Sequence, residues 1–370
     1  MTNFTLGSFS IERRQNRECS LYEIILMPTY TEMLTLLSFE QVKHSYKSWK
    51  EGKAVSQLGV VFDIQRFTLH DGPGLRTELF LKGCPMRCEW CGNPESWSTK
   101  IELGVYKSKC ISQRKCGLCE TVCDNRDILN FHRGKLVGIE SEGHLDCSVY
   151  ADACPADAIK QWGKEMSVKE CMEIIRKDRE YYEQSGGGVT VSGGEALLQS
   201  DFVAELFAAC KSEGIQTCFE TTFYGNWREV EKLLPYTDIW ISDIKHMDSK
   251  LHRKHTGVRN NRILENLKKL TDLERELILR IPVIPEVNDD PENIEATADF
   301  ILNELNGRIR TLQLLSFMRL GEEKYQALGI PYGMEGIKIK RKSFQKKVNK
   351  IAEYFNDRGI HCLVGTKERQ

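Results

Sequence analysis

The feature that most constrains the fold is an alternation of short apolar runs with amphipathic stretches, which begins at Thr77 and continues towards the C-terminus. The expected strands are Glu78–Leu81, Gly188–Val191, Thr217–Glu220, Asp238–Ser242, Leu277–Val283, Thr311–Leu315 and Ile360–Val364. Repeated strand–helix units form parallel sheets with right-handed crossovers. About six such units predict an α/β protein with a partial (β/α)6 barrel of the TIM type, whose chemistry lies at the C-terminal strand ends.

Helical periodicity separates these runs. One helix is expected over Val168–Glu183, because Ser167 and Glu170 form a capping box in front of an apolar face. Another is expected over Asp201–Ser212, with Gly214 just beyond its end.

Two segments interrupt the alternation. Residues 107–162 are rich in cysteine and show little periodicity, so we expect a small inserted domain that is organised by metal rather than by an apolar core. Residues 1–57 contain no motif with an assignable role and are expected to be an N-terminal extension, or to reflect an upstream start with Met27 or Met33 as the true one. The barrel is expected over residues 58–106 and 163–370, beginning with a strand at Val60–Ile64.

Charge and hydropathy exclude several classes of partner. The 52 lysines and arginines nearly balance the 53 aspartates and glutamates, which leaves no broad basic surface for nucleic acid. No apolar stretch reaches the roughly 20 residues that cross a bilayer, and the N-terminus lacks the order of a signal peptide. A cytoplasmic, monomeric protein is expected.

The fourteen cysteines indicate metal ligation, because disulfides are typical of small secreted chains. Nine of them fall between residues 84 and 154: Cys84, Cys88, Cys91, Cys110, Cys116, Cys119, Cys123, Cys147 and Cys154. The scattered ones are expected to be small core residues: Cys19, Cys171, Cys210, Cys218 and Cys362.

The strongest local signal is a Cys-x3-Cys-x2-Cys run, Cys84, Cys88 and Cys91, directly after the strand that ends at Leu81. A cluster of four irons is commonly held by four cysteines, so three thiolates leave one iron open. Catalytic metals keep such an open position, whereas structural ones close it. A zinc knuckle, or an electron-transfer cluster with its fourth ligand elsewhere, is the alternative.

This loop resembles the signature of the radical S-adenosylmethionine superfamily. The resemblance implies that the cofactor chelates the open iron of a [4Fe–4S] cluster, and that reductive cleavage yields a 5'-deoxyadenosyl radical that abstracts hydrogen. Ser192-Gly193-Gly194-Glu195 resembles the glycine-rich turn of that family, and later strand ends carry matching charged residues. The cofactor contacts so implied are Trp90, Cys91, Gly92, Gly193, Gly194, Glu195, Glu220, Thr221, Asp243, Ile244, Lys245, Arg280 and Met318. A monovalent cation is a further expectation from the family.

A second motif narrows the resemblance. Asp71-Gly72-Pro73-Gly74 followed by Arg76 precedes the cluster loop, and Asn93-Pro94-Glu95-Ser96 follows it. Together with the Gly186–Glu195 segment, these residues resemble the activating enzymes of glycyl radical enzymes over roughly residues 59–370. The resemblance implies that the enzyme abstracts hydrogen from a glycine Cα of a partner enzyme. Partner contacts are expected at Asp71, Gly72, Pro73, Gly74 and Arg76. The expected electron donor is a flavodoxin or a ferredoxin.

The insert is similar to a ferredoxin. Cys110, Cys116, Cys119 and Cys123 resemble one ligand run, and Cys147 with Cys154 the end of another. Two ferredoxin clusters need eight ligands, so one auxiliary cluster is expected and a second stays open, with His144 and Tyr150 at the places of missing cysteines. Such an insert is typical of activators of arylacetate decarboxylases, choline lyase, benzylsuccinate synthase and isethionate lyase.

Two positions depart from the family pattern. Gly92 follows the third cluster cysteine, where histidine is common, and Met318 stands where many relatives have histidine. Two other classes stay open from the sequence: a radical enzyme acting on a small molecule, and an electron carrier without chemistry of its own.

Overall fold

A computed structural model describes residues 57–122, 128–140 and 147–366. The strands are β1 (Leu58–Thr68), β2 (Arg76–Leu81), β3 (Glu102–Val105), β4 (Leu129–His132), β5 (Lys135–Ile139), β6 (Ile159–Trp162), β7 (Lys164–Ser167), β8 (Gly188–Gly193), β9 (Gln216–Glu220), β10 (Ile239–Asp243), β11 (Glu276–Val283), β12 (Thr311–Ser316) and β13 (Cys362–Val364). The α-helices are α4 (Leu118–Thr121), α5 (Cys147–Asp152), α6 (Val168–Ile175), α7 (Arg179–Ser185), α8 (Ser200–Ser212), α9 (Trp227–Leu233), α10 (Ser249–Thr256), α11 (Asn261–Asp272), α12 (Pro291–Asp299), α13 (Glu322–Leu328) and α14 (Arg341–Asp357). Across these described residues, the search for a helix with the length and apolar character of a membrane span found no candidate.

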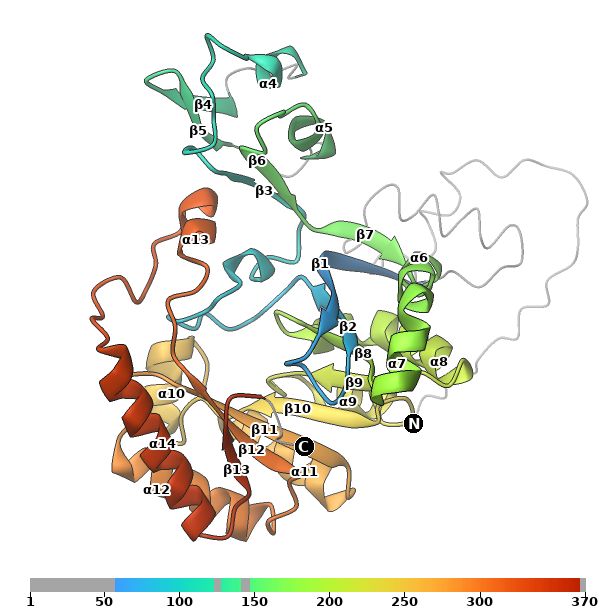
Figure 1. Cartoon of the computed structure of the whole chain (residues 1–370), viewed down its shortest axis with the longest axis vertical. Coiled ribbons are helices and arrows are strands. Elements are labelled where there is room, and N and C mark those ends of the chain that lie inside the picture. The colour runs from blue at the N-terminus through green and yellow to red at the C-terminus, as the bar shows by residue number, and fades with distance from the viewer. Residues whose placement is uncertain (1–56, 123–127, 141–146, 367–370) are drawn as a thin grey trace, which may run out of the picture. The chain divides into compact units, whose positions relative to one another are not determined.

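The central sheet has nine strands in the order β13-β12-β11-β10-β9-β8-β2-β1-β7 (Figure 1). The seven strands from β13 to β2 are mutually parallel, whereas β1 and β7 add an antiparallel edge. The parallel α/β sheet predicted from the alternating pattern is confirmed. Each strand expected after Thr77 is found within two residues of its predicted bounds. Because the strands are parallel, their C-terminal ends share one edge, where β2 leads into the cluster loop.

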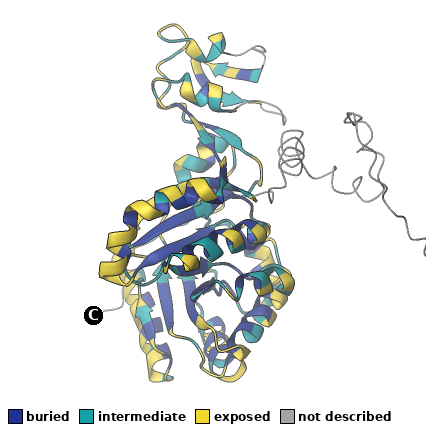
Figure 2. Cartoon of the chain, turned by 90° about the vertical axis from the view of Figure 1, so that its right-hand side faces the viewer, coloured by how far each residue is buried: buried dark blue, intermediate teal, exposed yellow. Residues whose placement is uncertain are grey.

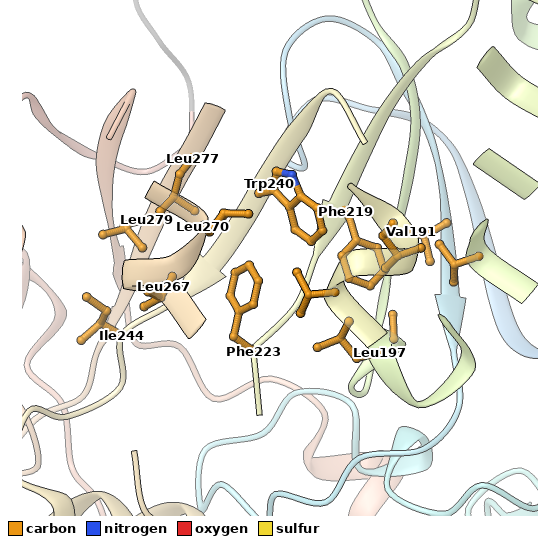
Figure 3. Close-up of a cluster of buried hydrophobic side chains, with 14 of the residues drawn as sticks. Val191, Leu197, Phe219, Phe223, Trp240, Ile244, Leu267, Leu270, Leu277 and Leu279 are labelled. Atoms are coloured by element: carbon orange, nitrogen blue, oxygen red, sulfur yellow. The ribbon is translucent and has the colours of Figure 1, made fainter. Parts of the chain in front are cut away.

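A large apolar core lies between the sheet and the helices that cover it. Figure 2 shows the strands of the central sheet mostly dark blue and the outward surfaces of the covering helices largely yellow. Trp240 of β10 packs edge-on against Phe219, with ring centroids 5.5 Å apart, and stacks on Phe223 at 5.6 Å (Figure 3). All three side chains are fully buried. Burying each large apolar side chain contributes about 1.5–3 kcal/mol, so this core anchors the strands whose ends carry the site.

The capping box at Ser167 and Glu170 is confirmed, but the single helix expected over Val168–Glu183 is wrong in detail. A 3₁₀ turn, η3 (Arg176–Asp178), separates α6 from α7. The turn buries the carboxylate of Asp178, which accepts hydrogen bonds from Arg66 and Thr77 of the first two strands. The acid therefore ties the segment to the sheet.

The cysteine-rich segment forms two small antiparallel sheets, β3 with β6 and β4 with β5. Its first strand starts at Glu102, five residues before the predicted start of the insert at residue 107. The expectation that metal alone organises this segment is wrong, because Leu136, Tyr150 and Ile159 are buried in an apolar core of its own. Of the scattered cysteines, Cys171, Cys210, Cys218 and Cys362 are buried as predicted, and Cys19 lies outside the described residues.

Candidate active site

The cluster loop, residues 83–91, is held at its start and near its middle by backbone hydrogen bonds to other segments. The amides of Gly83 and Cys84 donate to the carbonyls of Ser96 (2.7 Å) and Trp97 (3.2 Å). Further along, the amide of Arg87 donates to the carbonyl of Thr256 at the end of α10 (2.8 Å). These bonds fix the loop to rigid elements, as a precise ligand geometry requires.

The three loop thiols are free and suit an iron–sulfur cluster. Burial raises the pKa of Cys84 and of Cys88 to about 12, and it also raises that of Cys91. A thiol with such a pKa stays protonated until a metal displaces the proton. Lys245 is a neighbouring cation; although burial opposes it, Asp243 and Cys88 raise the pKa of its ammonium group. The site is therefore arranged for thiolates once metal binds.

The glycine-rich turn after β8 packs directly on the cluster loop. A Cβ on Gly193 would stand 2.3 Å from the amide nitrogen of Leu81, and one on Gly194 would stand 2.3 Å from the carbonyl oxygen of Gly83. The amide of Glu195 donates to that same carbonyl at 2.7 Å. Only glycine fits here, because any side chain would separate the turn from the loop.

The carboxylate of Glu195 accepts hydrogen bonds from within the protein. Its side chain is fully buried. Oε1 accepts from the hydroxyl of Thr221 (2.5 Å) and Oε2 from the amide of Thr222 (2.9 Å). The carboxylate therefore joins the turn to the end of β9, and the cofactor contact expected at Glu195 stays a prediction.

Arg280 of β11 is the centre of a buried polar network. Its guanidinium pairs with Glu220 (2.7 Å) and Asp71 (3.3 Å), and it donates to Gln313 (3.0 Å) and to the carbonyl of His70. Only 4% of the residue is exposed. Four hydrogen bonds within the protein thus occupy most of the five N–H donors of Arg280, and its expected contact with a cofactor carboxylate stays a prediction.

Three carboxyl groups meet beside this arginine. Side-chain oxygens of Asp71, Glu78 and Glu220 lie within 4.8 Å of one another. Burial, followed by hydrogen bonding to Asp71, raises the pKa of Glu78 to about 11. Glu78 is therefore neutral near pH 7, which lowers the repulsion within the group.

The Asp71–Gly74 loop lies against the same face of the sheet. Gly72 and Gly74 have φ of +118° and +69°, and a Cβ on Gly74 would stand 2.4 Å from the amide nitrogen of Gly187. The hydroxyl of Thr190 donates to the carbonyl of Asp71 at 2.6 Å. Interior contacts thus hold the loop against the sheet.

Arg76 departs from its predicted role as a partner contact. It is fully buried and donates to Thr190 (2.7 Å), the carbonyl of Pro73 (3.0 Å), Gln216 (2.9 Å) and the carbonyl of Val189 (2.8 Å). A side chain with no exposed surface cannot touch a partner without rearrangement. Arg76 instead connects the Asp71–Gly74 loop to the sheet through its hydrogen bonds to Pro73 and Thr190.

The other expected cofactor residues lie in three different settings. Asp243 and Lys245 pair at 3.0 Å beside the loop cysteines. Trp90 is partly buried, Met318 is 48% exposed, and Gly92 faces Leu320. Ile244 differs, since its side chain is buried in the core shown in Figure 3 and its amide donates to the carbonyl of Arg280.

Comparison with known proteins decides the family. Residues 79–301 match the Radical SAM superfamily. The chain is 67% identical over 314 residues to the (2S)-3-sulfopropanediol dehydratase activating enzyme of Klebsiella oxytoca, covering 85% of this chain and 99% of that protein. The chain belongs to the radical SAM activating enzymes of glycyl radical enzymes.

More distant relatives agree. The isethionate sulfite-lyase activating enzyme of Oleidesulfovibrio alaskensis is 38% identical over 274 residues, 73% of this chain and 87% of that protein. The 4-hydroxyphenylacetate decarboxylase activating enzyme of Clostridioides difficile is 36% identical over 311 residues, 83% of this chain and 96% of that protein. The function predicted from the sequence, a radical enzyme with a protein substrate, is confirmed. Membership implies S-adenosylmethionine and a [4Fe–4S] cluster.

In this activating enzyme, four insert cysteines line one cavity: Cys110, Cys116, Cys119 and Cys154. The sulfur of Cys110 accepts the amide of Leu136, and that of Cys154 accepts the amide of Ala158, both at 3.3 Å. Amide-to-sulfur bonds of this kind are common around iron–sulfur clusters. Cys123, His144 and the side chain of Cys147 lie outside the described residues.

Sequence reasoning missed a group of residues around the cluster loop of the activating enzyme. Lys324 and Tyr325 of α13 contact residues 91–95, and Lys82 donates to the carbonyl of Glu95. Glu95 belongs to a motif that the sequence singled out without a role. The lysines gave no signal, because their partners are distant in sequence.

Proposed function

We propose that this enzyme installs the glycyl radical in a dehydratase of the (2S)-3-sulfopropanediol type. The observation that carries the proposal is the 67% identity, which extends over 99% of the relative. One electron cleaves a carbon–sulfur bond of S-adenosylmethionine, giving methionine and a 5'-deoxyadenosyl radical. That radical takes a hydrogen atom from a glycine Cα, which leaves 5'-deoxyadenosine and the glycyl radical.

Cys84, Cys88 and Cys91 would hold the [4Fe–4S] cluster, which when bound supplies the electron and an open iron for the cofactor. The backbone of Gly193 and Gly194 would face the methionyl group, because no side chain obstructs the approach. Trp90, Gly92, Thr221 and Met318 would line the remainder of the cofactor site, and Asp243 with Lys245 would set its charge. A monovalent cation would lie near Glu220 and Asp243.

The Asp71–Gly74 loop would receive the glycine-bearing segment of the partner. Its backbone turns and the Asp71 carboxylate can hold an extended peptide through its amides. Arg76 would act as a positioning residue beneath the loop. A flavodoxin or ferredoxin would deliver the electron to a monomeric enzyme.

The domain division predicted from the sequence, a partial (β/α)6 barrel at residues 58–106 and 163–370 with a ferredoxin-like insert at 107–162, would need the start of the insert moved to Glu102, where its first strand begins. Cys110, Cys116, Cys119 and Cys154 would hold one auxiliary cluster, since they share one cavity. In two-cluster ferredoxins the last cysteine of one run likewise ligates the cluster of the other. Tyr150, at the place of a further cysteine, is 3% exposed within the apolar core, which favours a single auxiliary cluster.

The test is anaerobic reconstitution with the dehydratase, using an isethionate lyase as the matched partner. Electron paramagnetic resonance should show a glycyl radical on the dehydratase, and 5'-deoxyadenosine should form in equal amount. A radical on the lyase alone would reassign the partner. Cofactor cleavage with no radical on either protein would refute the proposal.

A further inference from the structure

The segment from Gly321 to Gly333, which contains α13, lies along the second half of the cluster loop. A Cβ on Gly321 would stand 2.4 Å from the carbonyl oxygen of Gly92, and one on Gly333 would stand 2.9 Å from the Cβ of Glu89. Between them, the hydroxyl of Tyr325 donates to the carbonyl of Cys91 at 3.0 Å. The two ends and the middle of the segment therefore contact the loop or Gly92, the residue directly after it.

Glu95 binds the Gly321–Gly333 segment through an ion pair with α13. Its side chain is fully buried and its carboxylate pairs with Lys324 of α13. Lys324 also donates to Asn93 (2.9 Å), and Lys82 donates to the backbone carbonyl of Glu95 (2.7 Å). Loss of Lys324 would be strongly destabilising, because the buried carboxylate of Glu95 would be left uncompensated. This pair therefore fixes where α13 lies.

Glu95 also belongs to the short turn that carries the loop's own anchors. Ser96 and Trp97 accept the amides of Gly83 and Cys84. The ring of Trp97 packs edge-on against Tyr325, with centroids 5.6 Å apart. A shift of Glu95 would consequently reach the first and the third cluster cysteine.

The insert meets α13 on another side. The ring of Trp162 in β6 lies 5.7 Å from the ammonium group of Lys324. A Cβ on Gly104 of β3 would stand 2.7 Å from the indole nitrogen of Trp162 and 3.5 Å from the Cβ of Ala327. The contact leaves no free space, so α13 is packed between the insert and the cluster loop.

We propose that Glu95 is a positioning residue that, through Lys324, fixes α13 as a strut between the insert and the cluster loop. Through Tyr325, α13 holds the segment around Cys91. A change in how the insert packs on α13 is therefore transmitted to the radical cluster by direct contact. This inference rests on the proposed cluster ligands. It assigns the Asn93–Ser96 motif a task that neither the cofactor nor the partner explains.

The test is Glu95→Gln, which keeps the shape and removes the charge. In the metal-free protein, amide hydrogen exchange over residues 89–97 and 322–328 should become about tenfold faster. In the reconstituted protein, the midpoint potential should shift and the resonance spectrum of the cluster that responds to S-adenosylmethionine should change. KM for S-adenosylmethionine should rise more than kcat falls.

The matched control is Asp178→Asn. Asp178 is 1% exposed and pairs with Arg66, whose side chain is 39% exposed; the corresponding values for Glu95 and Lys324 are 0% and 30%. Both variants should lower the melting temperature, but only Glu95→Gln should alter exchange at residues 89–97 and the cluster spectrum. Equal changes in the two variants would overturn the proposal.

Two further variants keep the test decisive. If Glu95→Gln does not fold, Lys324→Gln should give the same exchange pattern and Lys324→Arg should restore most of it. Gly104→Ala, which inserts a methyl group between Trp162 and α13, should loosen residues 89–97 from within the insert. Unchanged exchange there would exclude the coupling. Because the exchange assay needs neither metal nor partner, it separates this inference from the proposed function.

Discussion

The cluster loop and the insert both gather cysteines, but they do so differently. The loop offers three thiols from nine consecutive residues, fixed by backbone bonds to two neighbouring segments. The insert brings four thiols from two distant segments to one cavity. Three ligands leave an iron open for chemistry, whereas four close the site. The difference fits the proposal that one polypeptide separates a reactive centre from a supporting one.

Removal of one loop thiol should have the largest effect, and it tests directly whether the loop holds the reactive centre. Cys84→Ala, Cys88→Ala or Cys91→Ala should lower cleavage of S-adenosylmethionine by on the order of a thousandfold or more, because the open iron is lost. The sheet should stay folded, since the loop lies outside the main core. Formation of 5'-deoxyadenosine measures the loss, and circular dichroism is the control. Retained cleavage by any of the three would contradict the assignment.

The paired change in the insert should have a smaller effect. Cys116→Ala with Cys119→Ala should remove the auxiliary iron but preserve the spectral response of the first cluster to S-adenosylmethionine. Radical formation on the partner should fall about tenfold, as when supporting ligands are lost. Cys154→Ala should lose the same iron. If the response disappears while the loop iron is retained, the two centres are not separate in function.

Substitutions of Asp71 and of Arg76, the charged residues in and after the Asp71–Gly74 loop, should have different effects. Asp71→Asn should lower the glycyl radical yield about tenfold while changing uncoupled cofactor cleavage little, because Asp71 lies in the loop that would hold the peptide and its pairing with Arg280 fixes that loop. Electron paramagnetic resonance and 5'-deoxyadenosine, measured in parallel, test this. Equal losses in both assays would remove Asp71 from partner recognition.

Arg76→Lys should act on stability. Lysine offers fewer donors than the guanidinium, so some of the acceptors that Arg76 binds would be left buried and unpaired. The expected loss is about 2–4 kcal/mol of unfolding free energy, with both activities declining together. Denaturant unfolding measures it. A variant of unchanged stability with a selective loss of partner radical would restore the direct role.

Stability should also depend on pH, through the buried carboxyl group of Glu78 in the sheet. The pKa of Glu78 is about 11 in the folded protein, against 4.5 for an ordinary glutamate. Above pH 4.5 the unfolded chain loses this proton while the fold keeps it, so stability falls as pH rises towards the folded pKa. Glu78→Gln should flatten that decline between pH 5 and 9, as thermal unfolding would show. An equally steep decline in the variant would refute the neutral carboxyl group.

Much of the fold could be predicted because strand and helix periodicity are local properties. The parallel strands from β2 to β13 and the capping box at Ser167 follow from residues close in sequence. The family also follows from motifs, since Cys84, Cys88 and Cys91 lie within one loop and the glycines of the next turn mark close backbone approach. The similarity to a dehydratase activator was not predicted, because the local motifs do not indicate which partner enzyme is activated.

What the sequence determined by itself is therefore the order of elements and the residue types of the reactive loop. Only the tertiary structure decided which charged residues face one another. Arg280, Arg76 and Glu195 suggested ligand contacts from their motifs, yet each is bound within the protein by partners distant in the chain. Likewise, Cys154 joins the Cys110 run, and Lys324 reaches Glu95, 229 residues away. Local pattern fixes periodicity and turns, but the desolvation of a charge, and hence the partner that it must have, depends on the packing of remote segments.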